Sequence, residues 1–163
     1  MLKVIKGQIK PFTVDTDKLY VTDPCYREPT IVLTAKRGKW LGWTEVVDCG
    51  YMWGERAATL TAMHIATEVS NIRELGKIDN LEGSVGVDAG MVTICSAMEE
   101  WGGDSPIYNG FCRVASNEGG IIDGVGIVSS SGFGDGSYSV YALRDNEDKV
   151  FAVKIEFITE DDL

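Results

Sequence analysis

Alternating apolar and polar positions are the clearest pattern in this chain. Large apolar residues recur at every second position of the segment 150–159, namely Phe151, Val153, Ile155 and Phe157. Successive side chains of a strand point to opposite faces, so this spacing predicts a strand with all four groups on one face. A second strand is predicted over 137–143, and the polar run 144–149 joins the two. The pattern therefore predicts a C-terminal β-hairpin.

Short β-branched and aromatic runs, separated by glycines, continue through the rest of the chain. The sequence holds 19 glycines and only 4 prolines, and such punctuation is typical of many-stranded β proteins. Further strands are predicted over 19–22, 30–34, 39–48, 56–69, 85–90, 91–95 and 121–129, the pair 85–90 and 91–95 meeting at a tight turn. Gly124 and Gly126 indicate a bulge or a close approach of backbones.

The remaining segments complete a single mainly-β architecture. The polar segment 71–82 is predicted as a loop, and 96–101 as one short helix. Trp40, Trp43 and Trp53 are predicted to be buried, since a tryptophan buries on the order of 200 Å². We predict one domain over 1–163, an antiparallel sandwich or barrel-like sheet with at most one or two short helices. The residues 160–163 form an acidic tail.

Length and charge narrow the class of partner. A chain of 163 residues suits one domain. Its formal net charge of −10 repels phosphate backbones, so direct nucleic-acid binding is not expected. The same charge attracts a basic surface on another protein and speeds the encounter. The predicted partner is therefore a protein with a basic surface.

The four cysteines and the first residues of the chain indicate the cellular compartment that we expect for the protein. Cys25, Cys49, Cys95 and Cys112 form no Cys-x-x-Cys pair, so a zinc ribbon or thioredoxin-like motif is excluded. Lysines interrupt the opening residues, which cannot form the apolar part of a secretion signal. No apolar run approaches the ~20 residues that span a bilayer. We expect a cytoplasmic protein with free thiols, no membrane contact and no cofactor.

His64 is the only histidine, so any imidazole-based mechanism must use it. Cys25, His64 and Asp88 would supply the nucleophile, the base and the orienting carboxylate of a thiol hydrolase. The alternative is a structural His64 that is hydrogen-bonded within a strand. The sequence leaves both interpretations open.

Three aspartates sit at strand edges beside glycine or proline: Asp23, Asp88 and Asp135. Carboxylates that converge from separate loops could bind Mg²⁺ or Ca²⁺, and with His64 they would form a metal-assisted hydrolase. The alternative is that each carboxylate caps backbone N–H groups of a turn. The capping interpretation is favoured over the metal site.

The loop 129–137 is the most unusual stretch of the sequence. Ser129, Ser130 and Ser131 precede three glycines and Asp135, a backbone that could approach a nucleotide-like ligand or offer N–H groups to an anion. It lacks the dinucleotide and P-loop signatures. A turn that feeds the hairpin is the alternative, but a ligand site would be sought here first.

Several motifs resemble an uncharacterised family of bacteria and their phages. The most specific is the run 128–141 with its Ser-Gly-Phe-Gly-Asp-Gly-Ser-Tyr core, and Val-Asp-Ala-Gly at 87–90 is weaker. The segments 23–26 and 53–56 also match, so the resemblance covers about residues 19–158. It implies a cytoplasmic, mainly-β protein encoded by a phage or mobile element, and no established reaction.

The leading functional hypothesis is a non-enzymatic acidic protein that binds and modulates a host protein, for example by inhibiting a defence or nucleic-acid enzyme. Its basis is the net charge of −10 and the lack of a complete catalytic signature. The alternatives are a metal-assisted or thiol hydrolase, and a module that binds a small nucleotide-like ligand.

Overall fold

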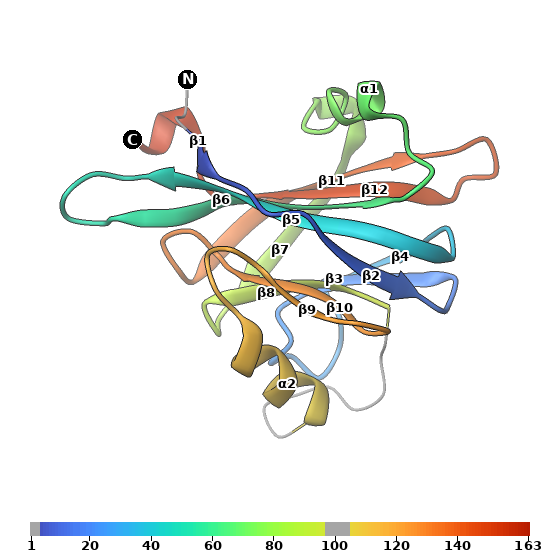
Figure 1. Ribbon diagram of the computed structural model, residues 1–163, viewed down its shortest axis with the longest axis horizontal. Coiled ribbons are helices and arrows are strands. Elements are labelled where there is room, and N and C mark those ends of the chain that lie inside the picture. The colour runs from blue at the N-terminus through green and yellow to red at the C-terminus, as the bar shows by residue number, and fades with distance from the viewer. Residues whose placement is uncertain (1–3, 97–104) are drawn as a thin grey trace.

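Two antiparallel sheets face each other as a sandwich in the computed structural model, which describes residues 4–96 and 105–163 (Figure 1). One sheet has seven strands and the other has five. The mainly-β prediction is confirmed, and of its two forms the sandwich is the one observed.

The larger sheet contains both long hairpins of the chain. In spatial order its strands are β1 (Val4–Lys6), β5 (Gly38–Asp48), β6 (Glu55–His64), β12 (Val150–Glu156), β11 (Gly136–Arg144) and β7 (Leu81–Val87). β2 (Lys10–Val14) pairs with the first half of β5, while β1 pairs with Val46 and Val47 near its end. The predicted C-terminal hairpin is confirmed as β11 and β12, which pair from Ser139↔Glu156 onward.

The smaller sheet consists of five short strands. Its order is β4 (Ile31–Thr34), β3 (Lys18–Thr22), β8 (Met91–Cys95), β10 (Gly126–Ser130) and β9 (Gly120–Ile122). A side chain at Gly126 would overlap the backbone of Ile94 and Cys95, so the close approach expected there is confirmed. β7 and β8 are consecutive, as predicted, but they belong to different sheets, and the turn 88–90 is a corner between the layers.

Short helices cover the two outer faces. α1 (Val69–Ile72) lies over the larger sheet and α2 (Pro106–Val114) over the smaller one, and single 3₁₀ turns span Ile78–Asn80 and Glu160–Asp162 (Figure 1). The Ser105 hydroxyl caps α2 by accepting the N–H of Tyr108 at 3.0 Å. No helix in the described part of the chain is both long and apolar enough to cross a membrane.

Two predicted elements differ from the structure, and a third lies almost entirely outside the described residues. The strand predicted over 56–69 ends at His64, after which the chain turns toward α1. The loop predicted over 71–82 contains a 3₁₀ turn and the start of β7. The helix predicted over 96–101 falls almost entirely outside the described residues, and α2 follows later, where the sequence was given no element.

The main core lies between the sheets and centres on fully buried side chains such as Trp40, Phe12 and Leu60. The predicted burial of Trp40 is thus confirmed. Trp43 is half-buried on the outer face of the larger sheet. The burial predicted for Trp53 is wrong, because this residue lies at the tip of the β5–β6 hairpin and is 54% exposed.

A β-bulge in β12 breaks the predicted alternation. Val153, Ile155 and Phe157 join the main core as expected, but Phe151 does not. Leu143 pairs with Ala152 and Arg144 with Val150, so Phe151 is the extra residue between two paired positions. A bulge re-aims a side chain, and Phe151 packs instead with Met63 and Leu75 on the outer face.

Candidate functional site

The Asp23 carboxylate fastens the corner between β7 and β8. It lies directly after β3 and is fully buried. One of its oxygens accepts the N–H of Cys25 at 2.8 Å, and the other accepts the N–H groups of Asp88 and Ala89, both at 2.7 Å. A buried carboxylate needs such partners, and this one uses them to join two distant segments.

Asp88 and Tyr26 extend this corner toward the surface. The Tyr26 hydroxyl donates to the Asp88 carboxylate at 2.7 Å. That hydrogen bond, with partial burial and the negative charge nearby, raises the pKa of Tyr26 to about 12. The Asp88 carboxylate therefore accepts a neutral phenol, and the pair contributes one more link between the segments 23–26 and 88–90.

Asp135 reaches the same corner from the loop between β10 and β11. Its carboxylate accepts the N–H of Gly90 at 2.9 Å. The three aspartates considered for a metal site thus all accept hydrogen bonds from protein groups. The described residues contain no group of three or more His, Cys, Asp or Glu side chains placed to hold a metal ion. This geometry matches capping for Asp23 and Asp135, whereas the Asp88 carboxylate accepts a side-chain hydroxyl, that of Tyr26.

The hydroxyls of Ser129 and Ser131, two of the three serines considered for ligand binding, bind the loop 129–137 itself, whereas no such bond is seen for Ser130 in the part of the chain that the structure describes. Ser129 donates to the carbonyl of Ser130 at 3.0 Å, and Ser131 donates to that of Gly134 at 2.8 Å. The Tyr138 hydroxyl lies 2.6 Å from the Gly134 carbonyl and 2.9 Å from that of Ser131. Ser129 and Ser131 are fully buried. The arrangement fixes a turn and leaves these hydroxyls committed to backbone carbonyls.

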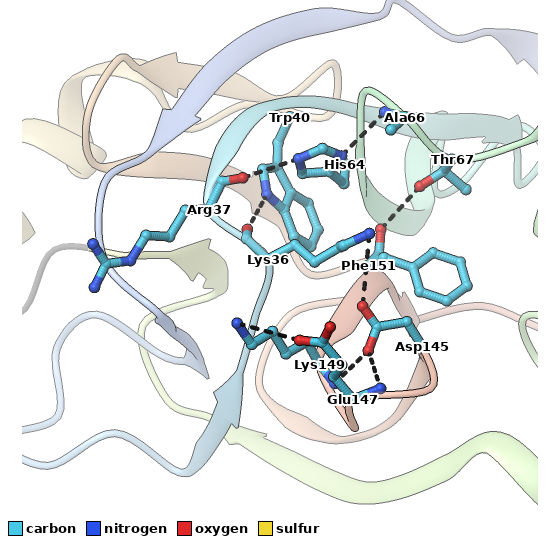
Figure 2. A network of polar contacts seen from close by, with 10 residues as sticks. All are labelled: Lys36, Arg37, Trp40, His64, Ala66, Thr67, Asp145, Glu147, Lys149 and Phe151. Carbon is cyan, nitrogen blue, oxygen red and sulfur yellow. Dashed lines mark hydrogen bonds and ion pairs between the residues drawn. The ribbon is translucent and has the colours of Figure 1, made fainter.

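His64 occupies a different place, at the end of β6 (Figure 2). Its Nδ1 accepts the N–H of Ala66 at 3.1 Å, so the proton lies on Nε2, which donates to the Arg37 carbonyl at 3.0 Å. The ring also meets Trp40 edge-on, with centroids 6.1 Å apart. Both nitrogens hold backbone groups, which is the structural role weighed for this residue.

The Cys25 thiol has no hydrogen bond to His64 or Asp88 within the described residues. Burial, together with the carboxylates of Asp23 and Asp88, raises the pKa of Cys25. A nucleophilic cysteine needs the opposite, a pKa that favours the thiolate. The structure therefore does not assemble the thiol mechanism from these three residues.

The loop 129–137 instead presents Phe133 to an aromatic cluster at one end of the sandwich. The β5–β6 hairpin projects beyond the sheets at this end (Figure 1). At its tip Tyr51 is fully exposed, and Met52 is 84% exposed. Phe133, 37% exposed, meets the Trp53 ring edge-to-face with centroids 5.1 Å apart. We call these four residues the aromatic tip.

Arg56 fixes the aromatic tip from the hairpin itself. Its Nε donates to the Trp53 carbonyl at 2.9 Å, and its guanidinium carbon lies 6.0 Å from the Trp53 ring centroid. Cation–π contact of this kind orients an exposed ring. Trp53 is thus held by Arg56 and Phe133, while Tyr51 and Met52 project further into solvent.

Exposed carboxylates lie on the hairpin and the loop that carry the aromatic tip, and one more lies near Tyr138 at the end of that loop. Asp48 and Glu55 pair across the hairpin immediately below it. Asp135 follows Phe133 by two residues, and Asp162 lies near enough to Tyr138 to raise the pKa of that phenol, behind the larger effect of burial. We call these four residues the acidic collar: Asp48, Glu55, Asp135 and Asp162.

The sequence contains a signal for this exposed loop, although the size of Trp53 favoured the prediction that it is buried. Tyr51, Met52 and Trp53 stand between Gly50 and Gly54, both of which adopt positive φ. Two glycines four positions apart, placed between two strands, mark a hairpin loop, and loop residues lie at the surface.

Comparison with known proteins identifies no relative, so the site is interpreted from its own geometry. No protein-family model, curated protein or solved structure matches this chain. The resemblance of its motifs to an uncharacterised family therefore stays a prediction.

Proposed function

We propose that this chain is a non-enzymatic interaction protein that binds a partner protein through the aromatic tip. The observation that carries the proposal is the exposure of Tyr51, Met52 and Trp53 together on one projecting hairpin. Large apolar side chains exposed as a contiguous group mark interaction surfaces. Tyrosine, tryptophan, methionine and arginine are also the residue types enriched at interface centres.

The fixed orientation of the Trp53 ring supports this function. Trp53 is held by Phe133 and Arg56, and Phe133 stands on a loop whose hydroxyls and Asp135 are hydrogen-bonded to backbone groups. A surface ordered before binding loses less conformational entropy on association. The glycine- and serine-rich loop thus serves recognition by positioning one aromatic ring.

The acidic collar specifies the partner's chemistry. An apolar pocket that receives the tip would bring its rim against Asp48, Glu55, Asp135 and Asp162, so lysines and arginines on that rim are favoured. The net charge of −10 adds long-range attraction to such a surface. Grooves that bind phosphate backbones have basic rims, and a nucleic-acid or defence enzyme inhibited by occupation of its groove is the partner class we propose.

Site-specific photo-crosslinking tests the proposal. Benzoylphenylalanine placed at Tyr51 should capture one major protein in the cells that express the chain, through a peptide that lines an apolar, lysine- or arginine-rimmed pocket. The same probe at Ile78, which is 76% exposed on the 3₁₀ turn Ile78–Asn80, is the matched control. With the purified partner, the double variant Tyr51→Ser, Met52→Ser should weaken binding by about 100-fold or more. Equal capture at positions 51 and 78, or an unchanged affinity, would contradict the proposal.

A further inference from the structure

A second site lies where the end of β6, the start of β5 and the β11–β12 turn meet. A cleft of about 250 Å³ opens there, lined by Lys36, His64, Ala66, Thr67, Glu68, Asn71, Asp145 and Phe151. It is built from three chain segments that are distant in sequence, and Figure 2 shows the polar network around it. None of the aromatic-tip residues belongs to it.

The backbone of this cleft is fixed by side chains that bind it from behind. Trp40 Nε1 donates to the Lys36 carbonyl at 2.9 Å, and His64 holds Arg37 and Ala66 through its two nitrogens. The Thr67 hydroxyl donates to the Phe151 carbonyl at 3.2 Å, at the bulge itself. The walls are therefore ordered without any ligand, as a binding site of defined geometry requires.

Most of the groups that face the opening are, by contrast, weakly engaged. Lys36 Nζ lies 3.6 Å from Asp145 Oδ2, longer than the 2.7–2.9 Å typical of a charge-assisted hydrogen bond. Asp145 Oδ1 accepts the backbone N–H groups of Glu147 and Lys149 at 2.9 and 3.0 Å, which fixes the carboxylate and leaves Oδ2 toward Lys36. Within the described ranges, the side chains of Glu68 and Asn71 make no hydrogen bond or ion pair. The cleft thus offers a ligand the Lys36 ammonium, Asp145 Oδ2, the Glu68 carboxylate and the Asn71 amide.

The bulge in β12 supplies the apolar wall. Regular alternation would have turned Phe151 into the core, but the extra residue places it on the outer face, where its half-buried ring lines the cleft. Bulges recur beside functional sites because they re-aim a single side chain. Here the re-aimed ring stands next to the Lys36–Asp145 pair.

We propose that this cleft binds a free α-amino acid. The ligand carboxylate would bind the Lys36 ammonium, and its ammonium would lie between the carboxylates of Asp145 and Glu68. Its side chain would pack against Phe151. The ligand dipole then runs antiparallel to the Lys36–Asp145 pair, so each charge meets its opposite.

Charge and size favour this class over a nucleotide. Two carboxylates beside one lysine give the cleft a negative balance that repels phosphate groups. Its 250 Å³ is below the roughly 300–1,000 Å³ of sites for drug-sized ligands. A simple cation would leave Lys36 without a role, whereas a zwitterion engages every charged group at the opening.

Ligand halves provide the decisive test. The standard amino acids are titrated at millimolar concentration by NMR and calorimetry, and leucine is compared with 3-methylbutylamine, which lacks its carboxylate, and 4-methylpentanoate, which lacks its ammonium. We expect saturable shifts at Lys36 and Phe151 with at least one amino acid. Each half-molecule of leucine should bind at least about tenfold more weakly than leucine does, if leucine is among the ligands.

Two charge-matched variants place the site. Lys36→Met should weaken amino-acid binding by about tenfold or more. Lys149→Met removes the same charge from the same region, where Lys149 lies 4.0 Å from Glu147 and does not line the cleft, and it should bind as the parent does. No saturable binding by any amino acid, binding of the amine equal to that of leucine, or equal loss in both variants would overturn the proposal. Circular dichroism verifies that each variant is folded.

Discussion

Phe133 packs edge-to-face against the Trp53 ring, with the ring centroids 5.1 Å apart, although the two residues belong to loops that are distant in sequence. Such pairs contribute about 0.5–1.5 kcal/mol beyond the area they bury. This contribution fixes the orientation of the Trp53 ring at the surface, since neither ring belongs to the main core of the sandwich.

Phe133→Ala should separate binding from folding. We expect the free energy of unfolding to fall by about 1–2 kcal/mol, less than for a core phenylalanine, because the ring is 37% exposed. Affinity for the crosslinked partner should fall by about 1–2 kcal/mol, because Trp53 loses its support as well as a contact. Urea denaturation and calorimetric titration measure the two quantities. A large loss of stability with unchanged affinity would show that the pair is structural.

Asp23→Asn should destabilise the whole sandwich. An asparagine side chain has one oxygen and one NH₂ group, so one of the two accepting oxygens of Asp23 is replaced by a donor. Either the N–H of Cys25, or the N–H groups of Asp88 and Ala89, then lose their acceptor. Leaving buried donors unsatisfied costs about 1–3 kcal/mol, so we expect a loss near 2 kcal/mol in chemical denaturation. Asp161→Asn is the control for the charge change, since Asp161 is exposed. Equal effects of the two variants would exclude the corner as a stabilising feature.

Cys25 should alkylate slowly in the folded protein. Burial and the neighbouring carboxylates raise its pKa, and only the thiolate attacks iodoacetamide. The alkylation rate increases with pH as the thiolate forms. In the folded protein this increase should therefore occur at a higher pH than for the same cysteine in the urea-unfolded chain. Mass spectrometry of the peptide resolves it from Cys112, which is exposed. If Cys25 is alkylated faster at pH 7 in the folded protein than in the unfolded chain, the result would contradict this prediction and support the thiol-enzyme hypothesis.

Local periodicity was sufficient to predict most strands, though not β1 and β2, and outside the C-terminal hairpin it did not predict their partners. The β11–β12 hairpin follows from alternation and a polar turn, both contained in one short segment. The separation of β7 and β8 into different sheets depends on hydrogen bonds to Asp23 and Asp135, which are remote in sequence. The bulge at Phe151 is equally invisible, because it arises from the register against Leu143 and Arg144.

The candidate sites were predictable only in their parts. The segments 23–26, 87–90 and 129–138 stood out by composition, and the structure brings all three to one corner. Their chemistry could not be assigned from sequence, since an aspartate that caps a turn and one that binds a metal have the same spacing. Trp53 was misplaced because hydrophobicity favours burial on average, whereas its position between two turn glycines decides its exposure.

The corner at 88–90 couples the two layers mechanically. Each of its amides is bonded to a carboxylate that belongs to another segment of the chain, Asp23 for Asp88 and Ala89, and Asp135 for Gly90. Separating the layers requires these bonds to break, so we expect the sandwich to open as one cooperative unit. The amides of Asp88 and Ala89, which donate to the fully buried Asp23, should accordingly exchange with deuterium at a rate close to that of global unfolding.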